Sequence, residues 1–272
     1  MQAANAGRKC KPECRPEKQV RKWRTHQALR RHTGTMSSSP TARVAALPWP
    51  DIESSLAQHG CAVTGPLLTP DECAALAALY DQDALFRSRV VMQRHGFGQG
   101  EYKYLAYPLP SALAQWREAL YARLAPLANA WASALGFAPD FPARHADYLA
   151  RCHAHGQARP TPLLLRYAPG DYNCLHQDLY GDLQFPLQLT VLLSRPGEDF
   201  TGGEFVLTEQ RPRMQSRAEV VPLQQGEAVL FFVNQRPVNG TRGTYRVAMR
   251  HGVSRVRSGR RMTLGLIFHD AA

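Results

Sequence analysis

Leu163-Leu-Leu-Arg-Tyr-Ala-Pro-Gly-Asp-Tyr-Asn-Cys-Leu-His176-Gln-Asp178 is the stretch that decides the fold. It predicts a buried strand, a turn at Pro169-Gly170 and a second extended segment that ends in His-x-Asp. Because side chains alternate faces along a strand, His176 and Asp178 are expected to project the same way. Two histidines and one carboxylate are the ligand set of non-haem Fe(II) oxygenases. The stretch therefore predicts two of three iron ligands.

Two later histidines, His251 and His269, are candidates for the third ligand. After His251, a turn at Ser258-Gly259 would let the following strand run antiparallel beside it. Arg261 and Thr263 share one face of that strand, and a guanidinium pairs bidentately with a carboxylate. His269 has only three residues after it and no comparable partner. We therefore predict His251 as the ligand, with Arg261 and Thr263 gripping the carboxylate of a cosubstrate.

The positive charge of the chain is concentrated at its N-terminus. The 272 residues carry a formal net charge of +11, and residues 1–35 hold ten Lys or Arg against two Glu. The remaining residues hold 23 basic against 20 acidic side chains, so the high pI says little about the folded part. No apolar run is long enough to cross a membrane, and no apolar signal core begins the chain. Six cysteines without a dense framework predict thiols in a cytoplasmic protein.

Residues 1–35 also contain a pattern close to a two-Cys, two-His zinc finger, formed by Cys10, Cys14, His26 and His32. Its spacer is one residue short and largely charged. We interpret residues 1–45 as a disordered basic leader and linker, with Met36 as an alternative start of translation. Residues 46–160 are then an N-terminal helical and mixed part, and residues 161–272 a barrel core.

The order of predicted elements indicates the fold class. Helices are expected at 69–85, at 111–135 with Pro126 kinking or dividing it, and at 142–151. Residues 88–108 alternate as strands do. Eight short strands follow Pro162, at 163–168, 173–178, 186–193, 203–208, 219–223, 227–233, 244–251 and 261–268. This predicts a mainly β protein with α: a double-stranded β-helix, or jelly-roll barrel, with an N-terminal helical buttress.

The pattern Tyr167-x-Pro-Gly, His176-x-Asp178, His251 and Arg261-x-Thr263 resembles the Fe(II)/2-oxoglutarate dioxygenase superfamily over roughly residues 160–270. Arg166-Tyr-Ala-Pro-Gly and the run 201–217 are similar to bacterial AlkB-like oxygenases described as acting on damaged, alkylated DNA. The resemblance implies Fe(II), 2-oxoglutarate and O2, with Tyr167, Arg261 and Thr263 around the cosubstrate. It also implies hydroxylation of a C–H bond, which at an N-methyl group releases formaldehyde.

Two positions depart from the AlkB pattern. Leu165 stands where those proteins carry an asparagine, and Ile267 stands where they carry a second arginine. The ten-residue spacing from His251 to Arg261 is similar instead to prolyl-hydroxylase-type enzymes. A protein hydroxylase is therefore the alternative function, and a non-catalytic jelly-roll binding module is a third.

An arginine-rich segment points to the substrate. Residues 236–261 hold eight arginines and no acid: Arg236, Arg242, Arg246, Arg250, Arg255, Arg257, Arg260 and Arg261. This segment leads into and out of the predicted ligand His251. The arginines could follow the phosphates of single-stranded or damaged nucleic acid, with Tyr172, Tyr180 or Phe185 stacking on a base. The competing interpretation is a set of solvated or ion-paired arginines.

Overall fold

The computed structural model describes residues 39–241 and 243–272. The chain divides into two units, residues 1–35 and 36–272, and the helices and strands given below belong to the second. The zinc-finger pattern of Cys10, Cys14, His26 and His32, and the proposed leader up to residue 38, lie outside the described residues.

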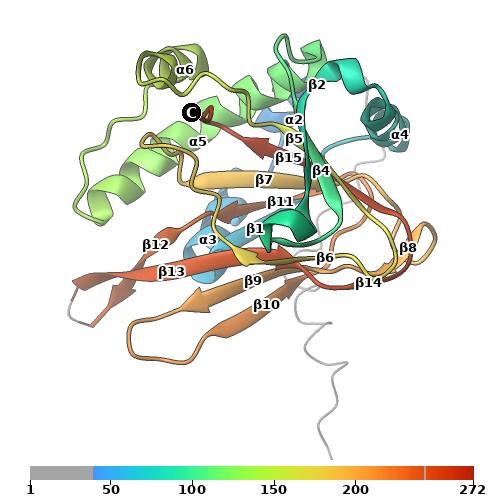
Figure 1. The fold of residues 1–272 in the computed structure, drawn as a ribbon. Coiled ribbons are helices and arrows are strands. Elements are labelled where there is room, and N and C mark those ends of the chain that lie inside the picture. The colour runs from blue at the N-terminus through green and yellow to red at the C-terminus, as the bar shows by residue number, and fades with distance from the viewer. Residues whose placement is uncertain (1–38, 242) are drawn as a thin grey trace, which may run out of the picture. The chain divides into compact units, whose positions relative to one another are not determined.

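Two large antiparallel sheets form the barrel (Figure 1). The seven-stranded sheet has the order β1 (Cys61–Pro66), β11 (Glu227–Phe232), β7 (Leu187–Leu192), β15 (Arg261–Ile267), β5 (Leu163–Tyr167), β4 (Glu101–Leu105) and β2 (Phe86–Val91). The six-stranded sheet has the order β10 (Arg217–Val221), β9 (Phe205–Gln210), β13 (Gly243–Val253), β6 (Tyr172–His176) and β3 (Gly98–Gln99), with β12 (Gln235–Gly240) pairing with β13. A small third sheet pairs β8 (Phe200–Gly202) with β14 (Val256–Gly259).

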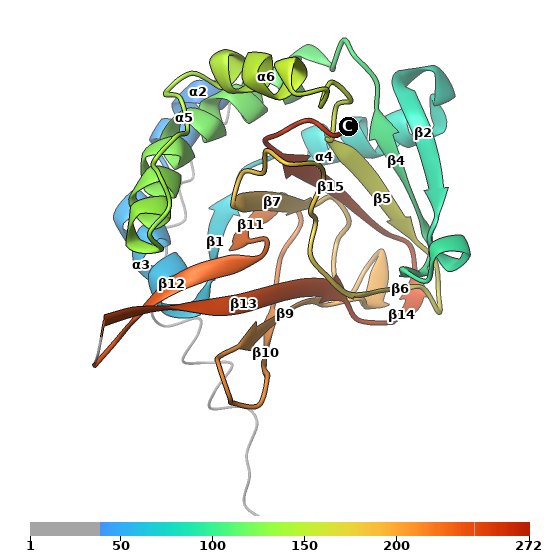
Figure 2. The same ribbon diagram turned by 60° about the vertical axis from the view of Figure 1, so that its left-hand side comes forward.

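Helices cover the outer side of the seven-stranded sheet (Figure 2). They are α2 (Pro40–Ala45), α3 (Trp49–His59), α4 (Pro70–Ala78), α5 (Ser111–Ala134) and α6 (His145–Ala154), with short 3-10 turns at Leu79–Asp81, Asp83–Leu85 and Met92–His95. The start of α4 follows its sequence closely. The Thr69 hydroxyl accepts from the Glu72 amide, and the Glu72 carboxylate accepts from the Thr69 amide. Helix α5 continues through Pro126 as one helix, so of the two outcomes expected there, a kink or a division, the division does not occur.

The inner faces of the two large sheets meet in the core. Phe231 of the first sheet lies 5.0 Å from Phe205 and 4.6 Å from His251 of the second, between ring centroids. The predicted jelly roll with a helical buttress is confirmed, and all eight strands predicted after Pro162 are present within a few residues of the predicted bounds.

The predicted linker is wrong at its C-terminal end. Residues 40–45 form α2, capped by the Ser39 hydroxyl, which accepts from the Ala42 amide. Arg43 of α2 is ion-paired with Glu72 of α4 at 2.6 Å. The folded part therefore begins before residue 46, because this pair and the packing of α2 on α5 hold the segment in place.

The N-terminal part also supplies strands to both large sheets, so it is more than a buttress. Strand β1 was not predicted, since its residues Cys61-Ala-Val-Thr-Gly-Pro carry apolar side chains without alternation. Its first five residues are buried, and it forms the edge of the seven-stranded sheet beside β11.

The strand after His251 also differs from its prediction. Arg261 was expected on a strand directly beside His251, but β15 pairs with β5 and β7 in the opposite sheet. The reason is β14, which continues the chain away from β13 and pairs with β8 before the turn at Gly259. Arg261 and His251 therefore lie in opposite sheets and not on neighbouring strands.

Candidate iron and 2-oxoglutarate site

Two strands of the six-stranded sheet bring His176 and His251 face to face. His251 of β13 is the register partner of His176 of β6, and their ring centroids are 4.2 Å apart. The register shifts just after this pair, where a Cβ on Gly252 would lie 2.7 Å from the Asn173 carbonyl. Glycine at that position therefore lets the two strands approach closely.

Asp178 completes the group although it lies past the end of β6. Its Oδ1 is 3.4 Å from His176 Nε2 and its Oδ2 is 3.3 Å from His251 Nε2. The ligand atoms of all three residues lie within 4.8 Å of one another, and among the described residues this is the one group of three or more His, Cys, Asp or Glu so arranged. The sequence prediction that these three side chains converge is confirmed.

The orientation of His176 suits a metal ligand. Its Nδ1 is 2.7 Å from the Cys174 carbonyl, to which it donates in the tautomer that leaves Nε2 free. A hydrogen bond of this kind fixes the ring and its tautomer in metal-binding histidines. The donor set of two imidazoles and one carboxylate therefore fits Fe(II) and leaves positions for further ligands.

The electrostatics of the group are those of a buried carboxylate between imidazoles. Burial raises the pKa of Asp178, but hydrogen bonds and charge from His176 and His251 outweigh this, and the net pKa is well below the usual range. Burial lowers the pKa of His176, yet Asp178 reverses the effect and the net shift is upward. The pKa of His251 is lowered, by burial and then by the neighbouring His176. Asp178 is thus held as an anion, the form that binds a metal.

Arg261 faces the same interior from the opposite sheet. It is 2% exposed, and its Nε and Nη1 meet no hydrogen-bond partner within the described residues. Its guanidinium lies 5.5 Å from the ring of Tyr167, its register partner on β5. A Cβ on Gly203 would come within 2.8 Å of Arg261 Cδ, so the Gly202-Gly203 turn makes room for this side chain. Burial lowers the pKa of Arg261 to about 10.

Buried guanidinium nitrogens without a partner are costly, so Nε and Nη1 of Arg261 point to an anionic ligand. Thr263 is buried two residues further along β15, opposite Leu165. Ile267 stands where AlkB-like oxygenases carry a second arginine, and it packs with Tyr104 and Leu163.

His269 lies outside the three-residue group. Its Nδ1 accepts a hydrogen bond of 3.1 Å from the Phe185 amide, and burial lowers its pKa to about 4. It is a buried, neutral histidine of the C-terminal segment.

Sequence reasoning missed the side chains that support Asp178. The Tyr180 hydroxyl donates to Asp178 Oδ1 at 2.7 Å, and the Tyr104 hydroxyl donates to Tyr180 at 3.0 Å. Tyr180 was one of three candidates for stacking on a base, and its hydroxyl is bonded here to a candidate iron ligand. Tyr104 lies on β4, and nothing in its local sequence marks it.

An apolar cavity of about 350 Å³ adjoins this group, with Asp178 in its wall. It lies between the C-terminal half of α5, residues 135–141, the loop 179–186 and the start of β12. Six aromatic side chains contribute to its lining: Trp131, Phe137, Phe141, Tyr148, Phe185 and Phe232.

Comparison with known proteins agrees with this geometry. Residues 100–271 match a family described as "Oxygenase, catalysing oxidative methylation of damaged DNA" (Oxygenase-NA). The chain belongs to the Oxygenase-NA family. It is therefore an oxygenase, and the two imidazoles and one carboxylate described above are a donor set that fits Fe(II).

Relatives and solved structures extend the comparison. Two uncharacterized proteins of Mycobacterium tuberculosis, MT2286 and Rv2227, are each 50% identical over 165 residues, 61% of this chain and 71% of theirs. A Pseudomonas putida prolyl-4-hydroxylase has a TM-score of 0.46 at 17% identity, covering 82% of this chain and 98% of that one. A 2OG-Fe(II) oxygenase family oxidoreductase of Burkholderia pseudomallei has a TM-score of 0.46 at 17% identity, covering 82% and 92%.

Two further expectations from the sequence concern membrane-spanning helices and the state of the cysteines. None of the described helices is long and apolar enough to cross a membrane. The four described cysteines, Cys61, Cys73, Cys152 and Cys174, are free thiols, as expected.

Proposed function

We propose that this oxygenase oxidatively demethylates alkylated nucleic acid. In this proposal His176, Asp178 and His251 hold Fe(II), and Arg261 pairs with the distal carboxylate of 2-oxoglutarate, beside Tyr167 and Thr263. The bound iron supplies oxidation of a C–H bond at the expense of 2-oxoglutarate and O2. Hydroxylation of an N-methyl carbon gives a product that separates into formaldehyde and the demethylated base.

The observation that carries the nucleic-acid reading is the aromatic cavity beside Asp178. Its volume of about 350 Å³ lies within the range of small-ligand sites, ~300–1,000 Å³. Trp131 and Phe232 form one wall, with ring centroids 4.1 Å apart. A base stacked on an aromatic side chain gains ~1–3 kcal/mol, whichever base it is. A flat ring therefore suits this cavity, and one end of it would lie close to the iron.

The chain's own groups would orient such a ring and exclude water. Asp140 at the cavity is paired with Arg151 at 2.6 Å, whereas the exposed Asp182 contributes negative charge to the lining. Phe137 is half exposed, and Arg246 of β13 lies over its ring at 4.5 Å while donating to the Leu135 carbonyl. This contact joins the segment 135–141 to β13 beside the cavity.

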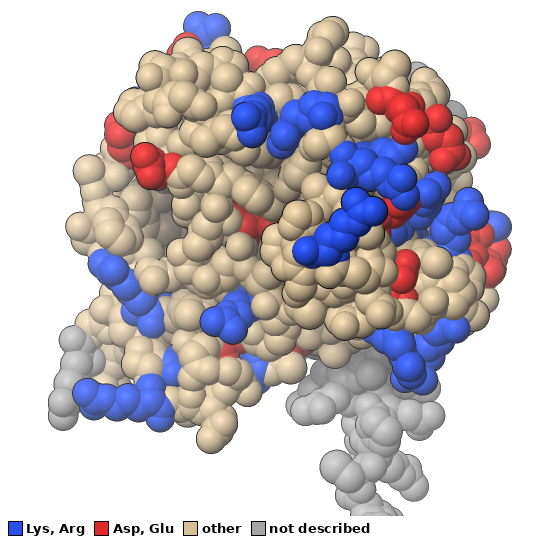
Figure 3. Space-filling view, viewed as in Figure 1, with Lys and Arg blue, Asp and Glu red and all other residues tan. Residues whose placement is uncertain are grey.

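Only some of the arginines in the segment 236–261 are exposed, so this segment supports nucleic-acid binding only in part. Arg236 is buried and ion-paired with Glu209, Arg261 is inside the barrel, and Arg246 lies on Phe137. Arg242 is outside the described residues. Exposed members of the segment remain available for phosphates: Arg250, Arg255, Arg257 and Arg260. Figure 3 shows Lys and Arg in several separate groups on the face drawn, with acidic side chains among those on its right.

A protein hydroxylase remains the second candidate, favoured by the ten-residue spacing between His251 and Arg261. The cavity would also accept a prolyl ring; its aromatic walls favour a flat base, but its volume alone does not separate the two. The product does, because hydroxylation of a ring carbon leaves the hydroxyl in place and releases no formaldehyde.

The test is formaldehyde release from an N-methylated single-stranded oligonucleotide, with Fe(II), 2-oxoglutarate and O2. We expect release with the methylated strand and none with its unmethylated counterpart. Phe137→Ala should raise KM for the oligonucleotide, whereas Met214→Ala, at an exposed residue outside the cavity lining, should not. Succinate formation stimulated by a prolyl peptide but not by methylated strands would instead establish the hydroxylase.

A further inference from the structure

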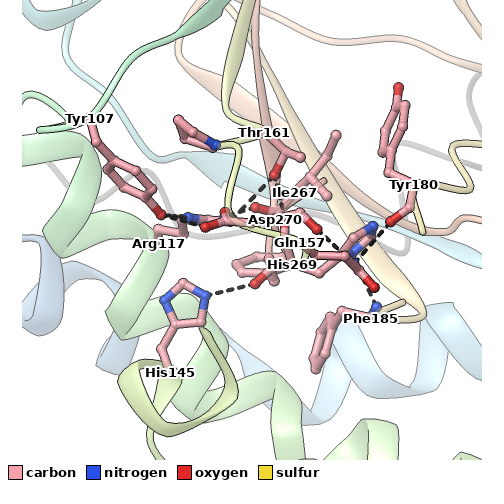
Figure 4. Close-up of polar contacts among 12 residues, drawn as sticks. Tyr107, Arg117, His145, Gln157, Thr161, Tyr180, Phe185, Ile267, His269 and Asp270 are labelled. Atoms are coloured by element: carbon pink, nitrogen blue, oxygen red, sulfur yellow. Dashed lines mark hydrogen bonds and ion pairs between the residues drawn. The ribbon is translucent and has the colours of Figure 1, made fainter. Parts of the chain in front are cut away.

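Gln157, just after α6, holds the loop that follows Asp178. It is 2% exposed, and its Nε2 donates to the carbonyls of Tyr180 at 3.1 Å and Leu183 at 3.0 Å. Its Oε1 accepts from the Leu183 amide at 2.8 Å. One amide side chain therefore takes up three backbone groups of one loop. Figure 4 shows Gln157 between Tyr180 and Asp270.

Gly181 shows how closely this side chain fits the loop. Its φ is +85°, a left-handed conformation that favours glycine. A Cβ there would lie 2.5 Å from Cδ of Gln157, closer than atoms can pack. The loop is thus shaped around the Gln157 amide, which is evidence independent of the hydrogen bonds.

The other end of Gln157 is fixed to a rigid anchor. Its Nε2 also lies 2.7 Å from the Asp270 carbonyl, so its two N–H groups are shared among three carbonyl oxygens. The Asp270 carboxylate is fully buried and pairs with Arg117 of α5 at 2.8 Å, and it also accepts from the Tyr107 hydroxyl at 2.8 Å. Arg117 donates further to the carbonyls of Ile267 and His269. The C-terminal segment is therefore locked to α5, as Figure 4 shows.

The loop that is bonded to Gln157 contains Tyr180, whose side chain supports the candidate iron ligand Asp178. The backbone of Tyr180 is bonded to Gln157, and its hydroxyl donates to Asp178 Oδ1 at 2.7 Å. Moving this backbone would withdraw the hydroxyl and free the carboxylate to turn. Such outer contacts typically contribute 10–100-fold to metal affinity.

We propose that Gln157 is a positioning residue for the metal centre, acting through the loop backbone and the Tyr180 hydroxyl on the Asp178 carboxylate. The inference rests on Asp178 being a metal ligand and not on the identity of the substrate. In this proposal the orientation of the Asp178 carboxylate depends on Gln157 and on the C-terminal segment to which Gln157 is bonded. None of the hydrogen bonds of Gln157 given above is to His176 or His251.

The test is a titration of the metal-free, full-length protein with Co(II), followed by the visible absorption of the bound ion. Gln157→Met keeps the length of the side chain but removes every hydrogen bond. We expect at least a tenfold weaker Co(II) affinity and an altered spectrum, because the carboxylate is less well held. Tyr180→Phe, which removes only the hydroxyl, should shift both readouts the same way, and the double variant should be little worse than the worse single one.

A matched control separates positioning from general destabilisation. Gln225 is a partly buried glutamine whose Nε2 donates to the Leu193 carbonyl at 2.9 Å, away from the site. Gln225→Met should lower Tm without changing Co(II) affinity or the spectrum.

Three results would overturn the inference. Wild-type affinity and spectrum in Gln157→Met would show that the loop holds Asp178 unaided. Equal effects of Gln157→Met and Gln225→Met would leave only a structural role. A wild-type protein that binds no Co(II) would refute Asp178 as a ligand, and the proposed function with it, whereas the first two results leave that function intact.

Discussion

Single side chains at the site divide into those placed to bind a metal and those that merely resemble ligands. His251 and His269 are both buried histidines near the C-terminus, and they differ in their neighbours. His251 faces His176 and Asp178, whereas the Nδ1 of His269 accepts from a backbone amide.

Replacement of these two histidines should therefore have opposite outcomes. His251→Ala should abolish stoichiometric Fe(II) binding, because one of three ligands is lost. His269→Ala should leave Fe(II) affinity within a few-fold while lowering Tm by a few degrees. Anaerobic equilibrium titration with Fe(II) measures the first and thermal unfolding the second. Loss of iron binding in His269→Ala alone would show that the assignment is wrong.

Residues of the site were predictable from sequence only where short spacing constrained them. His176 and Asp178 are two apart, so any extended backbone places them together. His251 was found because Arg261 and Thr263 follow it, although the strand pairing expected from that spacing was wrong. Gln157 gives no signal, because its partners lie 23 or more residues away and are backbone groups.

Elements at the N-terminal side are as much part of the barrel as those after Pro162. The eight later strands were predictable because turn residues separate short apolar runs. Strands β1, β8, β12 and β14 lack that pattern and form because neighbouring strands offer unpaired edges. Helix α2 likewise depends on α5 and on the Arg43–Glu72 ion pair, which the local sequence does not reveal.

Truncation should expose this boundary. A chain that begins at Ser39 should keep the Tm and the Fe(II) affinity of the full-length protein. A chain that begins at Leu67 loses β1 and its pairing with β11, and with it a row of buried side chains. It should be insoluble or lack cooperative unfolding, as measured by circular dichroism on heating. Equal Tm values for the two truncated chains would contradict the place given to β1.

The whole molecule should be sensitive to acid through its buried histidines. Burial lowers the pKa of His145 to about 3, and its Nε2 donates to the Phe268 carbonyl at 2.8 Å in the neutral state. In the unfolded chain His145 binds a proton near pH 6.5, whereas in the folded state the buried ring stays neutral at that pH. Stability is therefore fully present above pH 6.5 and falls as the pH drops below it, by at most about 1.4 kcal/mol per pH unit from this residue.

Denaturant unfolding between pH 7.5 and 5 checks this effect. The free energy of unfolding of His145→Gln should fall less steeply with decreasing pH than that of the wild type, whatever its absolute value. Parallel curves for the two proteins would show that His145 does not contribute.

Charge on the surface should govern nucleic-acid binding if the proposed substrate is correct. Binding of single-stranded DNA should weaken with salt, each phosphate contact adding ~0.7 to the log–log slope. Arg250→Glu and Arg255→Glu, at exposed positions flanking His251, should lower the affinity and the slope. Arg123→Glu on α5 serves as the charge-matched control, and turnover of 2-oxoglutarate without substrate should be unchanged in all three. Affinity that does not vary with salt would contradict a phosphate-contacting surface.

The proposed function depends most on one claim, that Arg261 of one sheet acts together with the candidate iron ligands of the other to hold 2-oxoglutarate. Its direct test is anaerobic titration of the Fe(II)-loaded protein with 2-oxoglutarate, followed by the visible absorption that appears when the keto acid chelates the metal. Arg261→Ala should need at least about 30-fold more 2-oxoglutarate, since loss of a buried charge partner costs ~2–5 kcal/mol. Arg260→Ala, at the exposed neighbouring position, should titrate like the wild type. Equal titrations for the two variants, or no absorption change in the wild type, would contradict the claim.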